Sequence, residues 1–215
     1  MRKTTLAVVF SILFFGQLSA QDYKIGIKIG PTISFARTGT DGPDTSIDGD
    51  GTSARILFGA FVDFGFKENY FFHTGINYAT KKTNITFSDP GLIGGNQIRE
   101  SYAHEYLQLP LLLKLFTNEV TLDTKVYFNF GVIPEVRLST SNDDVDLVAI
   151  SQFQSFDLAG NLGGGIERSL GPHTRILLGL NYNIGFLNMV KEQDEGLDKF
   201  NVKSNLLALE VGIKF

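Results

Sequence analysis

In eight segments of the chain apolar residues recur at every second position while the charged residues fall between them, and this pattern constrains the fold more than any other feature. In the last segment, for example, Leu209 and Val211 flank the charged residue Glu210. A period of two residues is that of a β-strand with one apolar face and one polar face. Charged residues are absent from all eight apolar faces and gather on the opposite faces. The segments are 24–35, 55–66, 70–81, 106–115, 125–138, 156–167, 175–186 and 206–215.

The lengths of the segments and of their connections point to a membrane barrel. Each segment has about 10 residues or more, enough for a tilted strand to cross a bilayer. Short connections (67–69, 117–123 and 169–173) alternate with long polar ones (37–53, 83–100, 139–154 and 188–200). Short turns at one end and long outward loops at the other are typical of outer-membrane barrels. The pattern predicts an all-β, eight-stranded antiparallel up-and-down transmembrane β-barrel in the bacterial outer membrane, with both termini periplasmic.

The N-terminus has the features of a cleaved signal peptide. Arg2 and Lys3 precede an apolar run over 6–15, and Leu18-Ser19-Ala20 offers small residues at a cleavage site. The alternative is an N-terminal membrane anchor, but the run is short for a spanning helix of about 20 residues. We therefore expect a signal peptide over 1–20 and one barrel domain over 21–215.

Composition excludes several other classes of protein. After removal of 1–20 the chain would carry 17 basic and 23 acidic residues, a net charge of −6, which gives no reason to expect nucleic acid as a partner. The chain has no cysteine, so neither disulfides nor thiolate metal sites contribute. Gly163-Gly164-Gly165 lies within a segment that no helix follows, so it does not indicate a nucleotide loop. We expect no cofactor; these glycines would instead let the strand bend or make room for opposing side chains.

The polar faces predict a charged barrel interior. Eight strands leave a lumen that side chains can fill, and charges confined there must pair or stay hydrated. We expect a salt-bridged plug, with a narrow anion-preferring path as the alternative because cations outnumber acids. The cations are Lys24, Lys28, Arg55, Lys81, Lys114, Lys125, Arg137, Arg175 and Lys214, and the acids are Asp63, Glu135, Asp157, Glu167 and Glu210.

Candidate catalytic and metal-binding residues are few. His104, with Glu105 or Ser101, is the one grouping at the outer rim that could serve a small outer-membrane protease or acyltransferase, although a structural role fits it better. Acidic residues crowd two long loops, at Asp41, Asp44, Asp48 and Asp50 and at Asp143, Asp144 and Asp146. They lack the spacing of an EF-hand, so we expect solvated loops and keep divalent-ion binding as an alternative.

One stretch of the fourth segment resembles a known family. Tyr106-Leu107-Gln108-Leu109-Pro110-Leu111-Leu112-Leu113-Lys114 is similar to the "YLxIPLLLKY" segment of the PorT-like outer-membrane β-barrel proteins of the Bacteroidetes. The motif positions that carry the resemblance are Tyr106, Leu107, Pro110, Leu111, Lys114 and Gly185 of the segment Tyr182-Asn183-Ile184-Gly185-Phe186-Leu187. The resemblance implies a membrane barrel that tolerates proline in this strand, and its namesake is linked to type IX protein secretion. The final Phe215 resembles the aromatic last residue that the barrel-assembly machinery recognises.

Two prolines interrupt the expected strands. Pro110 and Pro134 each forfeit a ladder hydrogen bond, so we expect a local bulge or water-bound backbone at both positions.

Three functional hypotheses follow. The first is a structural or interaction barrel, a monomer in outer-membrane lipid, that offers four extracellular loops to envelope or secretion proteins. The second is a narrow pore or an accessory of protein secretion across the outer membrane. The third is a soluble lipocalin-like carrier, which would require an apolar interior rather than an apolar outer surface.

Overall fold

The computed structural model describes residues 23–40, 46–49, 52–88, 98–142, 150–193 and 200–215; the predicted signal peptide lies outside this part of the chain. All of its regular elements are strands. In chain order they are β1 (Tyr23–Thr40), β2 (Ser46–Gly49), β3 (Ser53–Lys67), β4 (Tyr70–Ser88), β5 (Ile98–Gln108), β6 (Leu111–Thr121), β7 (Thr124–Asn142), β8 (Ile150–Phe153), β9 (Phe156–Ser169), β10 (Arg175–Gly185), β11 (Val190–Gln193) and β12 (Phe200–Lys214).

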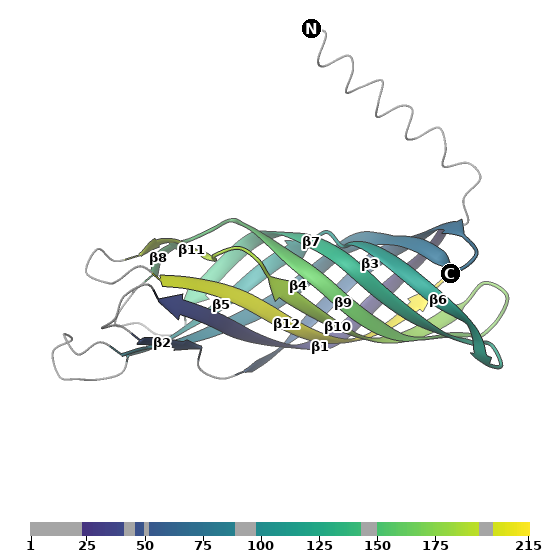
Figure 1. Cartoon of the computed structure of the whole chain (residues 1–215), viewed down its shortest axis with the longest axis horizontal. Coiled ribbons are helices and arrows are strands. Elements are labelled where there is room, and N and C mark those ends of the chain that lie inside the picture. Colours follow the sequence, from purple (N-terminus) through teal and green to yellow (C-terminus); the bar gives the residue numbers. More distant parts are fainter. Residues whose placement is uncertain (1–22, 41–45, 50–51, 89–97, 143–149, 194–199) are drawn as a thin grey trace, which may run out of the picture.

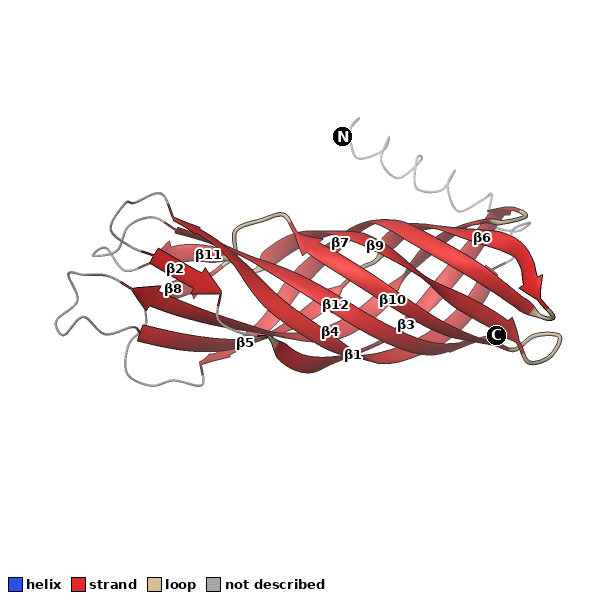
Figure 2. Ribbon diagram, turned by 60° about the horizontal axis from the view of Figure 1, so that its bottom comes forward, coloured by secondary structure: helices blue, strands red, loops and turns tan. Residues whose placement is uncertain are grey.

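The long strands form a closed antiparallel ring. β1 pairs with β3 on one side and with β12 on the other, so the first and last strands close the sheet. Around the ring the order is β1, β3, β4, β5 with β6, β7, β9, β10 and β12, in which β5 and β6 are two halves of one wall strand. The strands run obliquely along an elongated barrel (Figure 2). The structure therefore confirms the predicted eight-stranded barrel.

The apolar faces lie outside and the polar faces inside, as the alternation predicts. Large exposed apolar side chains encircle the wall, among them Ile27, Ile29, Phe58, Ile76, Leu109, Phe130, Leu162, Leu180 and Val211. A surface of this kind is stable in lipid and not in water. A soluble carrier of apolar ligands would need the reverse arrangement, so the third hypothesis is wrong. In the part of the chain that the structure describes, no helix is long and apolar enough to cross a membrane.

The two ends of the barrel differ. At one end lie the C-terminus and three short connections: the turn at Glu68–Asn69, the turn at Leu122–Asp123, and residues 170–174 (Figure 1). We call this the turn end. The turn at Leu122–Asp123 is tighter than the predicted 117–123, and Asp123 adopts a left-handed φ of 58°, which Asp tolerates better than most residues. The short strands β2, β8 and β11, and the ends of the long strands that lead into the long connections, lie at the opposite end, which we call the loop end (Figure 1).

The strands continue further toward the loop end than the sequence predicts. β4 ends at Ser88 rather than 81, β5 begins at Ile98 rather than 106, and β12 begins at Phe200 rather than 206. The predicted loops are therefore too long, because residues at their ends belong to the strands. The reason is that outward positions such as Lys82 and Lys203 are polar there, so the apolar alternation stops while the backbone ladder continues.

The two prolines meet across one seam of the wall. β5 ends at Gln108 and β6 begins at Leu111, so the wall strand is interrupted at Leu109-Pro110, directly beside Pro134 of β7. Leu109 N donates to Pro134 O at 2.9 Å. The register is the same on both sides of the interruption, so neither proline forms a bulge, and the alternative of a water-bound backbone stays a prediction. Successive residues of a strand direct their backbone groups to opposite neighbours, so the missing N–H of Pro134 lies in the ladder with β5 and β6, whereas that of Pro110 lies on the side of β4.

Candidate functional site

The barrel interior holds the charged residues that the sequence singled out. Nine of the predicted lumen residues are buried within it: Lys28, Asp63, Lys81, Lys114, Glu135, Asp157, Glu167, Glu210 and Lys214. The other five are only partly buried: Lys24, Arg55, Lys125, Arg137 and Arg175. Every one of them comes from an inward position of a strand, because alternate residues of a strand face opposite sides of the wall.

Near the turn end, two carboxylates are each shared by several cations. Asp63 accepts from Lys214 at 3.0 Å and from Lys114 at 3.3 Å, and its other oxygen lies 2.6 Å from Nδ1 of His73. Glu167 lies 2.6 Å from Lys214 and 3.1 Å from Arg175. These groups come from strands all round the wall, so their mutual contacts cross the lumen and fill it. We call Asp63, His73, Lys114, Glu167 and Lys214 the turn-end cluster.

Aromatic side chains close the space beside the turn-end cluster. The Lys114 ammonium lies 4.2 Å from the centre of the Tyr127 ring and 5.1 Å from that of Phe116. Such cation–π contacts are strongest where water is excluded. The hydroxyl of Tyr127 reaches across to Gly179, where an added Cβ would lie only 2.1 Å from it. Glycine at this position is therefore what allows Tyr127 to span the interior.

The glycine triplet 163–165 lies near Tyr127 and makes room for opposing side chains, one of its two predicted roles. A Cβ at Gly165 would lie 2.7 Å from the Tyr127 hydroxyl, and a Cβ at Gly163 would lie 2.0 Å from Oδ1 of Asn181. Two of the three glycines thus make room for lumen side chains from neighbouring strands.

The middle of the interior is polar and tightly filled. Lys28 donates to Glu210 at 3.0 Å, and both side chains are almost fully buried. Asn161 donates to Asn183 at 2.7 Å beside this pair. The remaining cavity at this level has room for about one water molecule.

A third level of ion pairing lies toward the loop end. Lys81 pairs with Glu135, and both are fully buried. Gln108 donates to the second carboxylate oxygen of Glu135 at 2.9 Å, and the Lys81 ammonium lies 4.6 Å from the centre of the Tyr106 ring. The pairing satisfies both charges, as a buried carboxylate and ammonium require.

A small two-stranded sheet covers the loop end of the lumen. β8 and β11 pair with each other and not with the wall (Figure 1). They lie over a buried apolar cluster formed by Ile85, Tyr102, Tyr106, Ile150, Met189, Val190, Phe200 and Val202. The ring of Phe153 lies 4.8 Å from the rings of both Tyr102 and His104, and the Arg137 guanidinium lies 5.1 Å from its centre. We call β8 and β11 the lid.

The sequence did not single out the lid or several of the residues beneath it. Glu100, which accepts from the Tyr102 hydroxyl at 2.5 Å, fell in a predicted loop, and Phe153 lay in another. His73 and Tyr127 occupy inward positions of the predicted strands, but the sequence does not indicate their partners. Their inward position was the available signal; which groups they meet depends on how the strands are staggered around the ring.

The candidate catalytic grouping at the rim is not assembled. His104 is fully buried, faces inward, and has its Nδ1 3.0 Å from the Thr140 hydroxyl. Ser101 and Glu105 lie on the outward face, where Ser101 donates to Asn84 at 2.8 Å. An odd separation along a strand places side chains on opposite sides of the wall. The grouping is therefore wrong.

The acidic loop residues give no structural support to a metal site. Asp41, Asp44, Asp50, Asp143, Asp144 and Asp146 lie outside the described residues, as does the side chain of Asp48. Within the described ranges, no group of three His, Asp or Glu side chains is arranged to hold a metal ion.

The motif residues serve different parts of the wall. Tyr106 and Lys114 face the interior, Leu107 and Leu111 face outward, and Pro110 interrupts the strand. A Cβ at Gly185 would lie 2.4 Å from the Ser204 carbonyl, which explains glycine there. The terminal Phe215 is exposed at the turn end, and its N–H donates to Ile25 O at 2.8 Å.

Comparison with known proteins assigns the family. Residues 15–191 match the family described as "Outer membrane protein beta-barrel domain". The chain belongs to this family, and it is an outer-membrane β-barrel protein. No curated protein matches it.

Several solved structures resemble the barrel. The outer membrane protein OprG from Pseudomonas aeruginosa is 17% identical, with a TM-score of 0.48 over 91% of this chain and 97% of its own. Neisserial surface protein A is 9% identical, with a TM-score of 0.45 over 87% of this chain and 95% of its own. Ail of Yersinia pestis is 14% identical, with a TM-score of 0.37 over 90% of this chain and 99% of its own. These TM-scores are below 0.5, so the similarities do not indicate the function of this chain.

Proposed function

We propose that this protein is a closed, non-conducting barrel that acts as an anchored interaction module of the outer membrane. The observation that carries the proposal is that the lumen is filled at successive levels, from the turn-end cluster through Lys28–Glu210 and Lys81–Glu135 to the lid. Ions crossing such a lumen would have to break buried ion pairs that lack competing water. Only the outer surface and the two ends remain available to other molecules.

The competing proposal is a narrow pore that favours anions. Its support is a local excess of positive charge near the turn end. There the three cations Lys114, Arg175 and Lys214 lie around two carboxylates. The closed barrel is favoured because each of these cations has a carboxylate within 4 Å, so none is offered to a passing anion.

Solute flux separates the two proposals. The barrel would be refolded into phosphatidylcholine vesicles that contain a chloride-sensitive dye, with a general porin as the positive control. A closed barrel leaves the rate of dye quenching at that of protein-free vesicles. Quenching that rises with the amount of folded barrel would contradict the proposal and favour the anion path.

The proposal also includes an orientation: the loop end faces the cell exterior and both termini face the periplasm. It rests on the contrast between tight turns at one end and long connections at the other. Since the chain has no cysteine, a single introduced cysteine is the one position that a maleimide can label. Glu192→Cys in the lid should react with a membrane-impermeant maleimide on intact cells, and Asp123→Cys in a turn should react only after lysis. The opposite result would reverse the orientation.

The PorT-like resemblance extends the proposal to a lineage and to partners. The segment from Tyr106 to Lys114 supports a PorT-like barrel of the Bacteroidetes, and we expect its partners to be envelope or secretion proteins that meet the loops. We further propose that Phe215 is read by the barrel-assembly machinery, since its ring is exposed rather than packed. Photo-crosslinking from the lid and from the turns would show which end is engaged. Phe215→Ala, which keeps the backbone hydrogen bond to Ile25, should slow assembly in cells without changing refolding in detergent.

A further inference from the structure

Two cations stand side by side on the outer surface of the barrel toward the loop end. Arg37 of β1 and Lys203 of β12 are direct partners across the β1–β12 ladder. Both occupy outward positions; Arg37 is exposed and Lys203 is half-buried. No acidic side chain of the described residues lies within 4 Å of either. Like charges placed directly opposite each other on neighbouring strands are destabilising, so this arrangement calls for a compensating anion.

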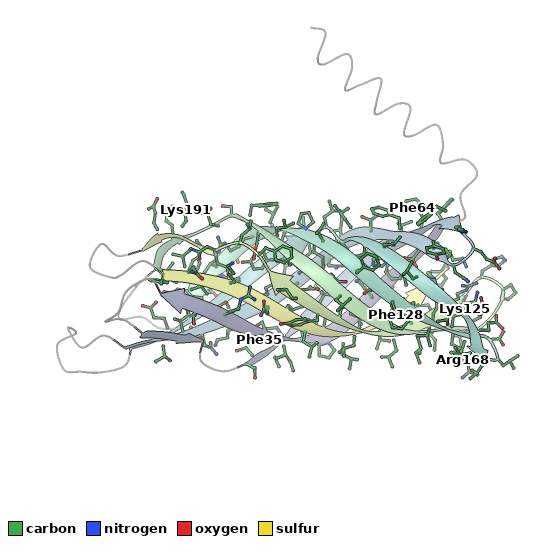
Figure 3. The ribbon with its side chains drawn as sticks, in the orientation of Figure 1. Phe35, Phe64, Lys125, Phe128, Arg168 and Lys191 are labelled. Atoms are coloured by element: carbon green, nitrogen blue, oxygen red, sulfur yellow. The ribbon has the colours of Figure 1, made fainter. Side chains whose placement is uncertain are left out.

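The pair lies where the apolar belt ends. Below it on β1, the outward residues are Phe35, Ile33 and Ile29. Phe35 stacks with Tyr182 of β10 at 6.2 Å, and Figure 3 shows Phe35 on the outside of the wall. Aromatic rings at the end of an apolar belt mark the boundary between hydrocarbon and headgroups. Arg37 lies two residues further along β1 on the same face, so it falls on the headgroup side of this boundary.

The geometry of the pair suits one phosphate. Directly opposed residues of an antiparallel ladder have Cβ atoms about 5 Å apart, so the two head groups can converge on a single anion. Arg37 is already held in place, since its Nη2 donates to Gly185 O at 3.1 Å. Guanidinium and ammonium groups form strong charge-assisted hydrogen bonds with phosphate oxygens.

We propose that Arg37 and Lys203 form a binding site for the phosphate of an anionic membrane lipid. The apolar surface beside Phe35 receives the acyl chains, and the two cations receive the headgroup. A zwitterionic headgroup binds less well, because its own ammonium competes for the phosphate. The proposal does not depend on whether the lumen conducts.

Native mass spectrometry of the refolded barrel, released from detergent, measures this directly. The probes are dimyristoylphosphatidylglycerol and dimyristoylphosphatidylcholine, which differ only in the headgroup. We expect retention of the phosphatidylglycerol, and about tenfold weaker retention in each of Arg37→Gln and Lys203→Gln, the loss of one charge-assisted contact. The matched control is Arg168→Gln: this exposed outward cation near the turn end faces Thr124 and Ile176 across its ladders rather than a second cation. Heat-modifiable gel migration verifies that each variant is folded.

Three results of the lipid-binding measurement would overturn the proposal. The first is equal retention of the two lipids, and the second is an equal loss in Arg168→Gln. The third is displacement of phosphatidylglycerol by excess inorganic phosphate, which would assign the site to free phosphate rather than to lipid. A structural role is tested separately: in phosphatidylcholine vesicles, Lys203→Gln should unfold at the same or a higher urea concentration than the wild type, because a repulsion is removed. Unfolding at a lower concentration there would also contradict the proposal.

Discussion

The ammonium of Lys214 lies 3.0 Å from a carboxylate oxygen of Asp63, although the two residues are 151 positions apart in the chain. Lys214 belongs to β12 and Asp63 to β3, the two neighbours of β1 in the ring. Their contact therefore passes across the inner face of β1, at the place where the first and last strands close the barrel. A charge pair inside the lumen thus ties the closing strands together.

Removing this lysine tests the turn-end cluster. Lys214→Met leaves Asp63 and Glu167 buried with fewer cations, and the loss of one partner from a buried ion pair costs about 3–5 kcal/mol. We expect the free energy of unfolding, measured by urea titration in lipid vesicles, to fall by that amount. Arg175→Gln is the control, because its side chain is 29% exposed and its contact with Glu167 should be worth about 1 kcal/mol or less. Equal losses in the two variants would show that burial does not set the strength of these contacts.

Tyr127 and Gly179 test how the lumen is packed. Gly179→Ala places a Cβ 2.1 Å from the Tyr127 hydroxyl, so the ring has to move and the variant should lose about 1–3 kcal/mol of stability. Adding Tyr127→Phe removes the clashing hydroxyl and should recover part of the loss, as a double-mutant cycle in urea would measure. Gly171→Ala is a neutral control, since no described atom lies within 4 Å of its Cβ. A loss in Gly179→Ala that Tyr127→Phe leaves unchanged would refute the contact.

The buried ion pair of Lys81 and Glu135, toward the loop end, tests how much stability depends on matching the two charges. Lys81→Met alone should destabilise the barrel by about 3–5 kcal/mol, because it strands a fully buried carboxylate. Lys81→Met with Glu135→Leu should recover most of that loss, since both charges are then absent. If the double variant is less stable than Lys81→Met, Glu135 is held mainly by Gln108 and not by the lysine.

The lid can be tested by crosslinking. Gln152 of β8 and Glu192 of β11 are register partners, and both are exposed. In a chain without cysteine, Gln152→Cys with Glu192→Cys should form a disulfide under mild oxidation, seen as a mobility shift that a reductant reverses. Moving one cysteine to Gln154 shifts it two residues along the chain and should slow the reaction. Equal rates would show that β8 and β11 do not hold a fixed register.

The wall of the barrel was predictable from the sequence, whereas the contacts within it were not. Alternation identifies which residues face outward, so Leu209 and Glu210 fall on opposite faces without knowledge of the tertiary structure. The same signal ends where outward positions such as Lys203 turn polar, and the predicted strands stop there too early. It also cannot say that Asp63 meets Lys214, because that depends on the stagger of strands around a closed ring. The lid formed by β8 and β11 joins two long connections that share no sequence pattern.

The central claim, a lumen closed by its own side chains, is tested most directly by planar-bilayer recording of the refolded wild-type barrel. Insertion is verified beforehand by heat-modifiable migration, and a general porin in the same bilayer confirms that open channels would be detected. The account predicts a current indistinguishable from that of the bare bilayer at moderate voltages of either sign. Large, stable conductance steps that scale with the amount of inserted barrel would contradict it.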